Sequence, residues 1–245
     1  MDIDFMINPQ WMPFGTSLAL NDLWGHAKSA YAVVRFGITN VKRALVAGNY
    51  FRSSGLGFGG FKRSKSVDLM IQIAKEHQLK NAKNIILLDH HTGLGPSGTD
   101  TLALLGQNDV GFNDLINETF PLEMDGDIIV GGDKASDTAG SAMSGYEFTI
   151  GTTDHYCRTW MHPEGNHLKD ILCLTQEFGT VPVIQVGKAQ IEENFAHHHG
   201  TAEQKRVYGE RLKGVFYVET QEWMRNVAHR GVTLWMQAFK FIQKD

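Results

Sequence analysis

The amino-acid sequence predicts an α/β domain, and three apolar patterns lead to that class. The run at residues 85–88 is too short for a buried helix, and its flanking polar residues and glycine favour a strand covered on both faces. A helical pattern precedes it at about residues 66–79. A second apolar run at residues 171–175 predicts another strand, and a helical stretch follows it from Pro182 to His199.

The composition indicates a globular protein. The chain has 245 residues, of which 42% are hydrophobic and 20% charged, and this is enough apolar material for a core. Its net charge of −4 argues against nucleic-acid binding. No apolar run approaches the roughly 18 residues of a membrane helix, and no signal peptide is evident. We therefore expect a soluble, cytoplasmic protein that binds neither nucleic acid nor membrane.

The rest of the chain divides into weaker patterns, without internal repeats or an evident linker. Residues 1–15 are apolar and irregular, which predicts a loop that packs against something or forms an oligomer interface. Thr16 or Ser17 can cap a helix, and a second helical pattern at residues 30–45 is interrupted by Gly37. Residues 126–130 suggest a strand, and residues 220–242 form the clearest amphipathic helix.

The candidate chemistry begins where the first strand is predicted to end. Asp89, His90 and His91 follow the apolar run directly. In an open α/β sheet, groups just past the carboxyl end of a strand line the ligand crevice. Strand alternation places the two histidines on opposite faces, so one of them is expected to enter a shared site. The competing interpretation is that these are polar residues at the start of a loop.

Glu177 occupies the corresponding place at the end of the second predicted strand. If the two strands are neighbours, its carboxylate can meet His91 across the crevice. A carboxylate there suits a general base acting on water held by a metal ion. Taken alone, Glu177 is better explained as a solvated acid at a strand end.

The glycine-rich segment Gly93–Gly98 matches the G-x-G-x-x-G outline of a dinucleotide site. His-His-Thr stands where the strand-to-phosphate turn should begin, and no second half of such a domain follows. The helix expected after Gly98 would also be short, because Gly106 would close it. A tight turn is therefore the favoured interpretation, with dinucleotide binding as a remote alternative.

Two further histidine clusters have spacings that match no zinc motif. His155, His162 and His167 lie in a predicted loop, and no H-E-x-x-H sequence occurs. The run at residues 197–199 follows a helix, where imidazolium groups favour the carboxyl end. We expect neither cluster to carry catalysis.

Four ordered stretches of the sequence resemble one known family. Residues 89–98 closely resemble its Asp-Leu-His-Thr-Gly-Leu-Gly-Pro-Tyr-Gly signature, and residues 55–60 look like its Gly-Leu-Phe-Tyr-Gly-Gly turn. Residues 175–180 resemble its Glu-Phe-Gly-Thr segment, and residues 215–238 are similar to its closing tryptophan-containing helix. From about residue 7 onward, the chain thus resembles an uncharacterised bacterial family of the zinc carboxypeptidase and aspartoacylase-like superfamily.

This resemblance implies one α/β domain over residues 1–245, with a mixed, mostly parallel central sheet and helices on both faces. It implies zinc as the cofactor, His91 as a zinc ligand, and Glu177 as the catalytic group that activates metal-bound water. Asp89 would hold the His91 ring in place. The implied substrate is a small peptide or an acyl-amino acid. The other residues expected to line the site are His90, Thr92, Gly93 and Thr180.

The sequence departs from the family pattern in its upstream part. The family draws two zinc ligands from a His-x-x-Glu motif, whereas no histidine here is followed three residues later by glutamate. The chain therefore corresponds to the carboxyl-terminal two-thirds of the family domain. No residue is assigned to bind the substrate, and Arg52, Arg63 and Arg158 are only candidates for holding its carboxylate.

Three functions remain open from the sequence. The first is a zinc-dependent amide-bond hydrolase. The second is a catalytically inactive relative that binds a ligand or forms a homo-oligomer through the apolar amino-terminal segment. The third and most remote is an oxidoreductase that binds a dinucleotide at Gly93–Gly98.

Overall fold

A four-stranded sheet lies at the centre of the part of the chain that the structure describes. The structure is a computed structural model, and it describes residues 3–82, 84–104, 120, 127–130, 153 and 171–243. Within these residues the strand order is β1-β4-β2-β3. The strands are β1 (Ile85–Thr92), β2 (Asp100–Leu104), β3 (Asp127–Val130) and β4 (Ile171–Phe178).

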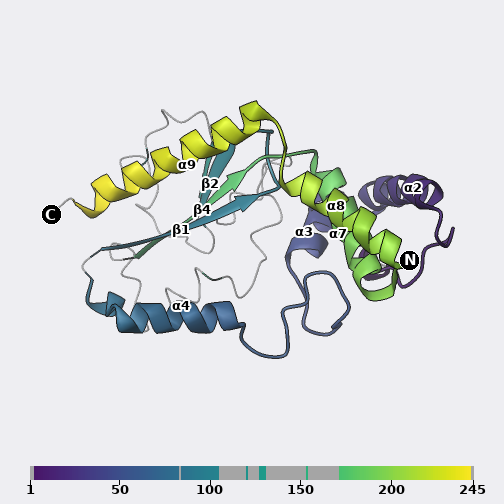
Figure 1. Ribbon diagram of the computed structural model, residues 1–245, viewed down its shortest axis with the longest axis horizontal. Helices are drawn as coiled ribbons and strands as arrows, with labels where there is room; N and C mark the ends of the chain where they lie inside the picture. The colour runs from purple at the N-terminus through teal and green to yellow at the C-terminus, as the bar shows by residue number, and fades with distance from the viewer. Residues whose placement is uncertain are drawn as a thin grey trace.

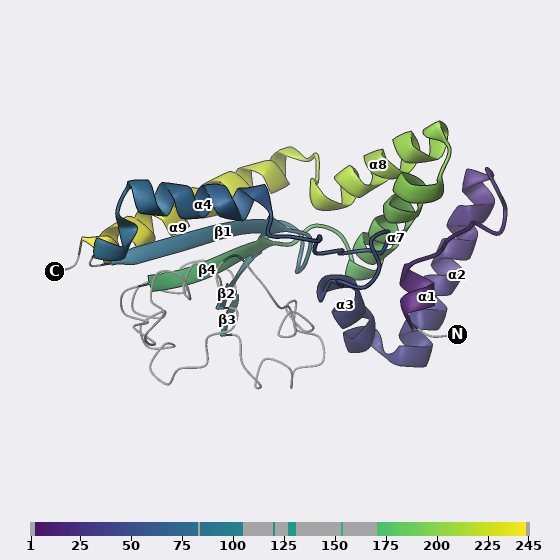
Figure 2. The same ribbon diagram turned by 90° about the horizontal axis from the view of Figure 1, so that it is seen from below.

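The sheet is mixed and mostly parallel, as the sequence led us to expect. β1 pairs with β4 in parallel, β4 pairs with β2 antiparallel, and β2 pairs with β3 in parallel. Figure 2 shows the four strands in this order, with β1 at one edge. The pairing of β1 with β4 joins segments about eighty residues apart in the sequence, and it is the pairing on which the candidate site depends.

Helices cover the sheet on both faces. α9 (Gln221–Ile242) lies above the sheet and α4 (Lys65–Glu76) below it in Figure 1. Because side chains alternate along a strand, every second residue of β1 and β4 points to α9. The core on that face consists of Leu102, Phe120, Leu172, Leu174, Leu234 and Ala238, with Ile86 and Leu88 packed against it. The chain therefore folds as a single α/β domain.

α4 delivers the chain to β1 and has a regular beginning. The Ser64 hydroxyl caps the helix by accepting a hydrogen bond from the Val67 N–H at 3.3 Å. The buried residues of α4 are Ile71 and Ala74, one turn apart on one side of the helix. The predicted helix–loop–strand unit is confirmed, although the helix ends at Glu76 and a short 3₁₀ turn, η1 (Leu79–Asn81), precedes the strand.

A group of helices stands beside the sheet, on the right of Figure 1. It contains α1 (Ile3–Ile7), α2 (Leu18–Phe36), α3 (Ile38–Val46), α7 (Val183–His199) and α8 (Ala202–Phe216). Asp22 on α2 joins three of them, because it accepts two hydrogen bonds from Arg211 at 2.7 Å and one from Lys188 at 2.5 Å. None of the helices that the structure describes is long and apolar enough to cross a membrane.

Several predicted elements differ from the structure at their ends. Residues 1–15 were expected to be irregular, but α1 forms there and buries Met6 and Ile7. The helical pattern at residues 30–45 was expected to form one helix, but it is divided at Gly37, whose φ of 80° is readily reached only by glycine. Its first part extends α2 and its second part forms α3. Ser17 stands at the amino-terminal cap of α2, although its side chain makes no capping hydrogen bond.

The region after the first strand contained the larger errors. The helix that a dinucleotide site would require after Gly98 does not form, because β2 occupies that position. The strand expected near residues 126–130 is confirmed as β3. α8 was not predicted, although Thr201 and Gln204 form a capping box at its start. The final helix is confirmed as α9, with Thr220 as its cap.

Candidate functional site

The pairing of β1 with β4 builds the candidate site. Asp89, His90 and His91 were expected to lie beyond the end of the first strand. β1 continues as far as Thr92, however, so these three residues lie within it. In the parallel register, His91 stands opposite Glu177 and Asp89 stands opposite Thr175. Since Asp89, His91 and Glu177 share one face of the pleated sheet, they converge on the face opposite α9.

The three side chains form a short chain of contacts. His91 Nε2 lies 3.0 Å from Asp89 Oδ2, and His91 Nδ1 lies 3.7 Å from Glu177 Oε2. The side chain of Glu177 is 1% exposed, whereas that of His91 is 40% exposed. The distance of 3.7 Å is too long for a hydrogen bond but close enough for a charge interaction. The predicted proximity of His91 and Glu177 is confirmed.

Glu177 is the most perturbed of these groups. Its Oε1 accepts a hydrogen bond from the Leu94 N–H at 2.9 Å, whereas its buried Oε2 has no hydrogen-bond partner among the described residues. Burial raises the pKa of Glu177 to about 7, with the Asp89 charge adding to the rise and the Leu94 N–H and His91 opposing it. This carboxyl group therefore exchanges its proton near neutral pH, as a general base requires.

Asp89 has the opposite electrostatic character. Its hydrogen bond with His91 lowers the pKa of the carboxyl group below the ordinary value, against the effect of partial burial. Asp89 is therefore ionised at neutral pH and accepts a hydrogen bond from His91 Nε2–H. This contact orients the imidazole ring and directs Nδ1 toward Glu177.

A tight glycine turn closes the end of the site. Its backbone is hydrogen-bonded to the end of β4. The Gly93 N–H donates to Phe178 O at 3.0 Å, and the Gly98 N–H donates to Gly179 O at 3.1 Å. Thr180 Oγ1 donates to Gly93 O at 3.2 Å, so Thr180 supports the turn. A Cβ atom at Gly179 would lie 2.0 Å from Pro96 O, which shows how closely the two backbones approach.

The same turn lacks the structural basis of a dinucleotide site. In that fold the glycine segment leads into a helix whose amino-terminal N–H groups receive the pyrophosphate. Here the segment leads into β2, which starts at Asp100. Gly93, Gly95 and Gly98 have φ values of 142°, 108° and 74°, and these describe a turn between two strands of one sheet.

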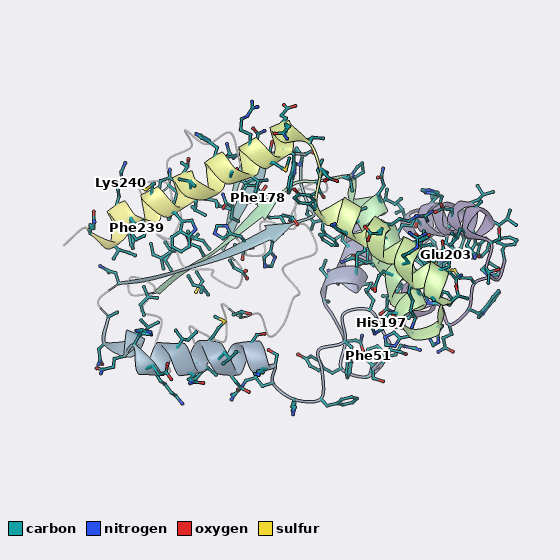
Figure 3. All side chains as sticks on the ribbon, viewed as in Figure 1. Phe51, Phe178, His197, Glu203, Phe239 and Lys240 are labelled. Carbon is teal, nitrogen blue, oxygen red and sulfur yellow. The ribbon has the colours of Figure 1, made fainter. Side chains whose placement is uncertain are left out.

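His90 lies on the other face of the sheet, as strand alternation predicts. Its Nδ1 is 2.9 Å from Gln176 Oε1, and Gln176 Nε2 donates to Asp100 Oδ2 at 2.6 Å. Asp100 Oδ1 in turn accepts a close hydrogen bond from Arg230 Nε on α9. His90 therefore does not line the site formed by His91. Figure 3 shows Phe178, two residues further along β4, beside α9.

Sequence reasoning missed Gln176, Asp100 and Arg230. Gln176 precedes Glu177 directly, so the alternation of β4 was the one signal that could have indicated a polar contact on the second face. The partners come from three distant segments, and no local pattern announces such a contact.

The remaining sequence candidates lie elsewhere. Arg52 pairs with Asp4 at 2.6 Å, and Arg63 pairs with Asp68 at 2.5 Å. Figure 3 shows His197 among the helices beside the sheet, away from the strands. Arg158 and the histidines at positions 155, 162 and 167 lie outside the residues that the structure describes.

The residues fit a zinc ion only in part. In the described part of the chain, no group of three or more histidine, cysteine, aspartate or glutamate side chains is arranged to hold a metal ion. His91 is suitably oriented as one imidazole ligand, with Asp89 fixing its other nitrogen. A catalytic zinc normally has three protein ligands, so this cluster supplies one ligand and a neighbouring base.

Comparison with known proteins gives one result that covers most of the chain. Residues 17–230 match the family described as "Protein of unknown function (DUF2817)". The chain belongs to this family. The DUF2817 match runs from the cap of α2 to Arg230 on α9, so it includes Asp89, His91 and Glu177. Neither the curated proteins nor the solved structures contain a match to the chain.

Proposed function

We propose that this DUF2817 protein is a zinc-dependent amide-bond hydrolase of the zinc carboxypeptidase and aspartoacylase-like superfamily. Its substrate would be a small peptide or an acyl-amino acid. One observation carries the proposal: a buried glutamate with a pKa of about 7 presents an oxygen 3.7 Å from an oriented imidazole, and no described residue forms a hydrogen bond with that oxygen. The order of the motifs in the sequence supports the same assignment.

Glu177 acts as the general base in this proposal. The Leu94 N–H holds Oε1, and Oε2 takes a proton from the attacking water. The water oxygen bonds to the amide carbon, the carbon–nitrogen bond breaks, and the proton passes from Glu177 to the leaving nitrogen. The products are a carboxylic acid and an amine. A pKa near neutrality suits a group that must both accept and return a proton.

His91 would hold the zinc ion through Nδ1, while Asp89 keeps the ring oriented through Nε2. The ion would supply polarisation of the carbonyl oxygen and of the water. Further ligands would have to come from outside the described residues, because those residues offer one imidazole on this face of the sheet.

A second candidate function is ligand binding or self-association without turnover. The observation that favours it is the absence of a three-ligand metal cluster among the described residues, together with exposed apolar side chains near the amino terminus. Trp11 and Phe14 are 61% and 44% exposed, respectively, as is common at interfaces between subunits. This alternative predicts no hydrolysis of any amide and a concentration-dependent oligomer.

The proposal is tested by measuring zinc binding and amide hydrolysis in the wild type and in variants at His91, Glu177 and His90. We expect the protein to bind zinc in calorimetric titration and to hydrolyse acyl-amino acids, with His91→Ala weakening zinc affinity at least about tenfold. Glu177→Gln should keep the zinc affinity and lose about two to four orders of magnitude in kcat. His90→Ala is the matched control, because His90 lies next in sequence but on the opposite face.

Two results would contradict the proposal. One is zinc affinity that falls equally in His90→Ala and His91→Ala, since only His91 faces Glu177. The other is hydrolysis that survives unchanged in Glu177→Gln.

A further inference from the structure

An apolar pocket opens directly beside the candidate site. It spans about 420 Å³, part of which is open to solvent, and is bordered by Gly93, which follows β1, and by Phe216 of α8. A Cβ atom at Gly93 would lie 2.8 Å from Phe216 Cε1 and 3.6 Å from Glu177 Oε1. Gly93 thus lies between the wall of the pocket and Glu177, with Oε1 as the near carboxylate oxygen. Its apolar lining consists of Leu45, Val46, Leu94, Val183, Val186 and Phe216.

A larger groove lies between α1, α2, α3 and α7. It spans about 830 Å³, part of which is open to solvent. Six of its apolar lining residues are Met6, Ile7, Trp11, Trp24, Ala32 and Val33. Of its charged lining residues, Lys188 and Glu192 neutralise each other at 2.8 Å. Lysine stems such as that of Lys28 add methylene surface.

The pocket and the groove adjoin each other and share part of their lining. Lys42, Leu45, Val183 and Gly187 line both of them. At their junction, a Cβ atom on Gly187 of α7 would lie 2.6 Å from Leu45 Cδ1 of α3. The glycine thus lets the two helices approach closely, and the Leu45 side chain stands where the two spaces adjoin.

We propose that this pocket and groove form one channel that holds a long, apolar acyl chain of the substrate. This inference rests on the proposed function, because it places the amide carbonyl at Glu177 and the chain in the space that starts at Gly93. Apart from Lys42, Thr92 and Gln190, the lining of the pocket is apolar or glycine, and this points to an apolar occupant, since burying a polar chain along such a lining would cost free energy. The substrate class is then an amino acid that carries a long acyl group on its nitrogen. Hydrolysis releases a long-chain carboxylate and the free amino acid.

Binding of simple carboxylates to the full chain tests the channel without any turnover. Sodium butanoate, hexanoate, octanoate and decanoate are titrated by calorimetry, with all concentrations below those at which micelles form. We expect the affinity to rise on the order of tenfold for each pair of added methylenes, because each buried methylene contributes apolar transfer free energy. An affinity that does not depend on chain length would overturn the inference.

Two variants locate the binding in the channel. Leu45→Trp fills the junction and should weaken decanoate binding at least about tenfold, while leaving butanoate binding within about twofold. Trp11→Ala removes an exposed wall of the groove, a change that the fold tolerates more easily, and should weaken decanoate binding severalfold. Ile73→Trp, on the exposed side of α4, is the matched control and should change nothing. Unchanged decanoate binding in both channel variants would overturn the inference.

Hydrolysis separates this inference from the proposed function. A kcat/KM that is higher for N-decanoyl than for N-acetyl amino acids supports both. Equal values for the two substrates overturn the channel and leave the hydrolase standing. Decanoate binding without hydrolysis of any amide supports the channel as a binding site and overturns the hydrolase. A dimer that Trp11→Ala dissociates, with no decanoate binding, would show that a second copy covers the groove, and it would overturn the channel.

Discussion

The two faces of the β1–β4 pair carry similar residues but differ at Gln176 and Glu177. Gln176 is hydrogen-bonded through both ends of its amide, whereas Glu177 is hydrogen-bonded through one oxygen within the described chain. On one face, His90 contacts Gln176, and the chain of contacts continues to Asp100 and Arg230. On the other face, His91 contacts Asp89 and approaches Glu177, whose Oε2 has no hydrogen bond within the described chain. The two histidines are consecutive in the sequence, and their partners are also consecutive.

This difference distinguishes the hydrogen bonds of Gln176, which connect elements of the fold, from the Glu177 cluster, which is suited to catalysis. Gln176 is 0% exposed, and its amide makes contacts on both sides, so these hydrogen bonds join β1, β4, β2 and α9. Glu177 is 1% exposed and half satisfied, which leaves its charge costly and its proton easily exchanged. A buried polar group that lacks a partner is a functional candidate, whereas a satisfied one contributes to the specificity of the fold.

The largest expected effect on stability lies on the face that carries Gln176 and Asp100. Asp100→Ala should lower the free energy of unfolding by roughly 3–5 kcal/mol, because it leaves Arg230 and Gln176 without their buried partner. Urea unfolding followed by circular dichroism measures this loss. Asp100→Asn keeps the side-chain volume and part of the hydrogen bonding, and it should lose less. A loss below about 1 kcal/mol in Asp100→Ala would remove the distinction between the two faces.

An intermediate effect concerns the pH dependence of stability at Glu177. Its carboxyl group has a pKa of about 7 in the folded chain and an ordinary value of 4.5. Unfolding therefore releases a proton between these two values, and the free energy of unfolding falls as the pH rises through that window. The contribution is roughly 2–3 kcal/mol. Urea unfolding at pH 5 and pH 8 should show this fall in the wild type and a smaller fall in Glu177→Gln.

The contrast between the faces would be lost if Glu177→Gln kept the full pH dependence of the wild type. It would be sharpened if Glu177→Gln proved as stable as the wild type at pH 8, because the neutral amide then replaces a buried charge.

The smallest effect is expected at Asp89. Its pKa is lowered by the contact with His91, so the contact stabilises the folded chain above the ordinary pKa of 3.8 and stops doing so as the pH falls through the lowered value. Asp89 is 42% exposed, and solvent screening limits the contribution to less than about 1 kcal/mol. Asp89→Asn should therefore cost little at pH 6 and still less at pH 3 in urea unfolding. A loss that is larger at pH 3 than at pH 6 would contradict the assigned role.

The sequence alone identified the class of the fold and the two strands that carry the site. Short apolar runs at residues 85–88 and 171–175 predict buried strands, because a run of this length cannot form a buried helix. Alternation along a strand also separates His90 from His91 without any knowledge of their partners. The resemblance to a family then singled out His91 and Glu177, whose roles stay proposals.

Tertiary structure decided how far the strands extend and which groups meet. Asp89 and His91 are polar, so periodicity ended the strand before them, but hydrogen bonding with β4 carries β1 on to Thr92. The raised pKa of Glu177 comes from the burial of its side chain in the folded protein. The polar contacts of Asp100 with Gln176 and Arg230 join segments that lie far apart in the sequence. Patterns along the chain report the local preference of each segment. The pairing of distant segments is what fixes the solvent exposure and the partners of each polar atom.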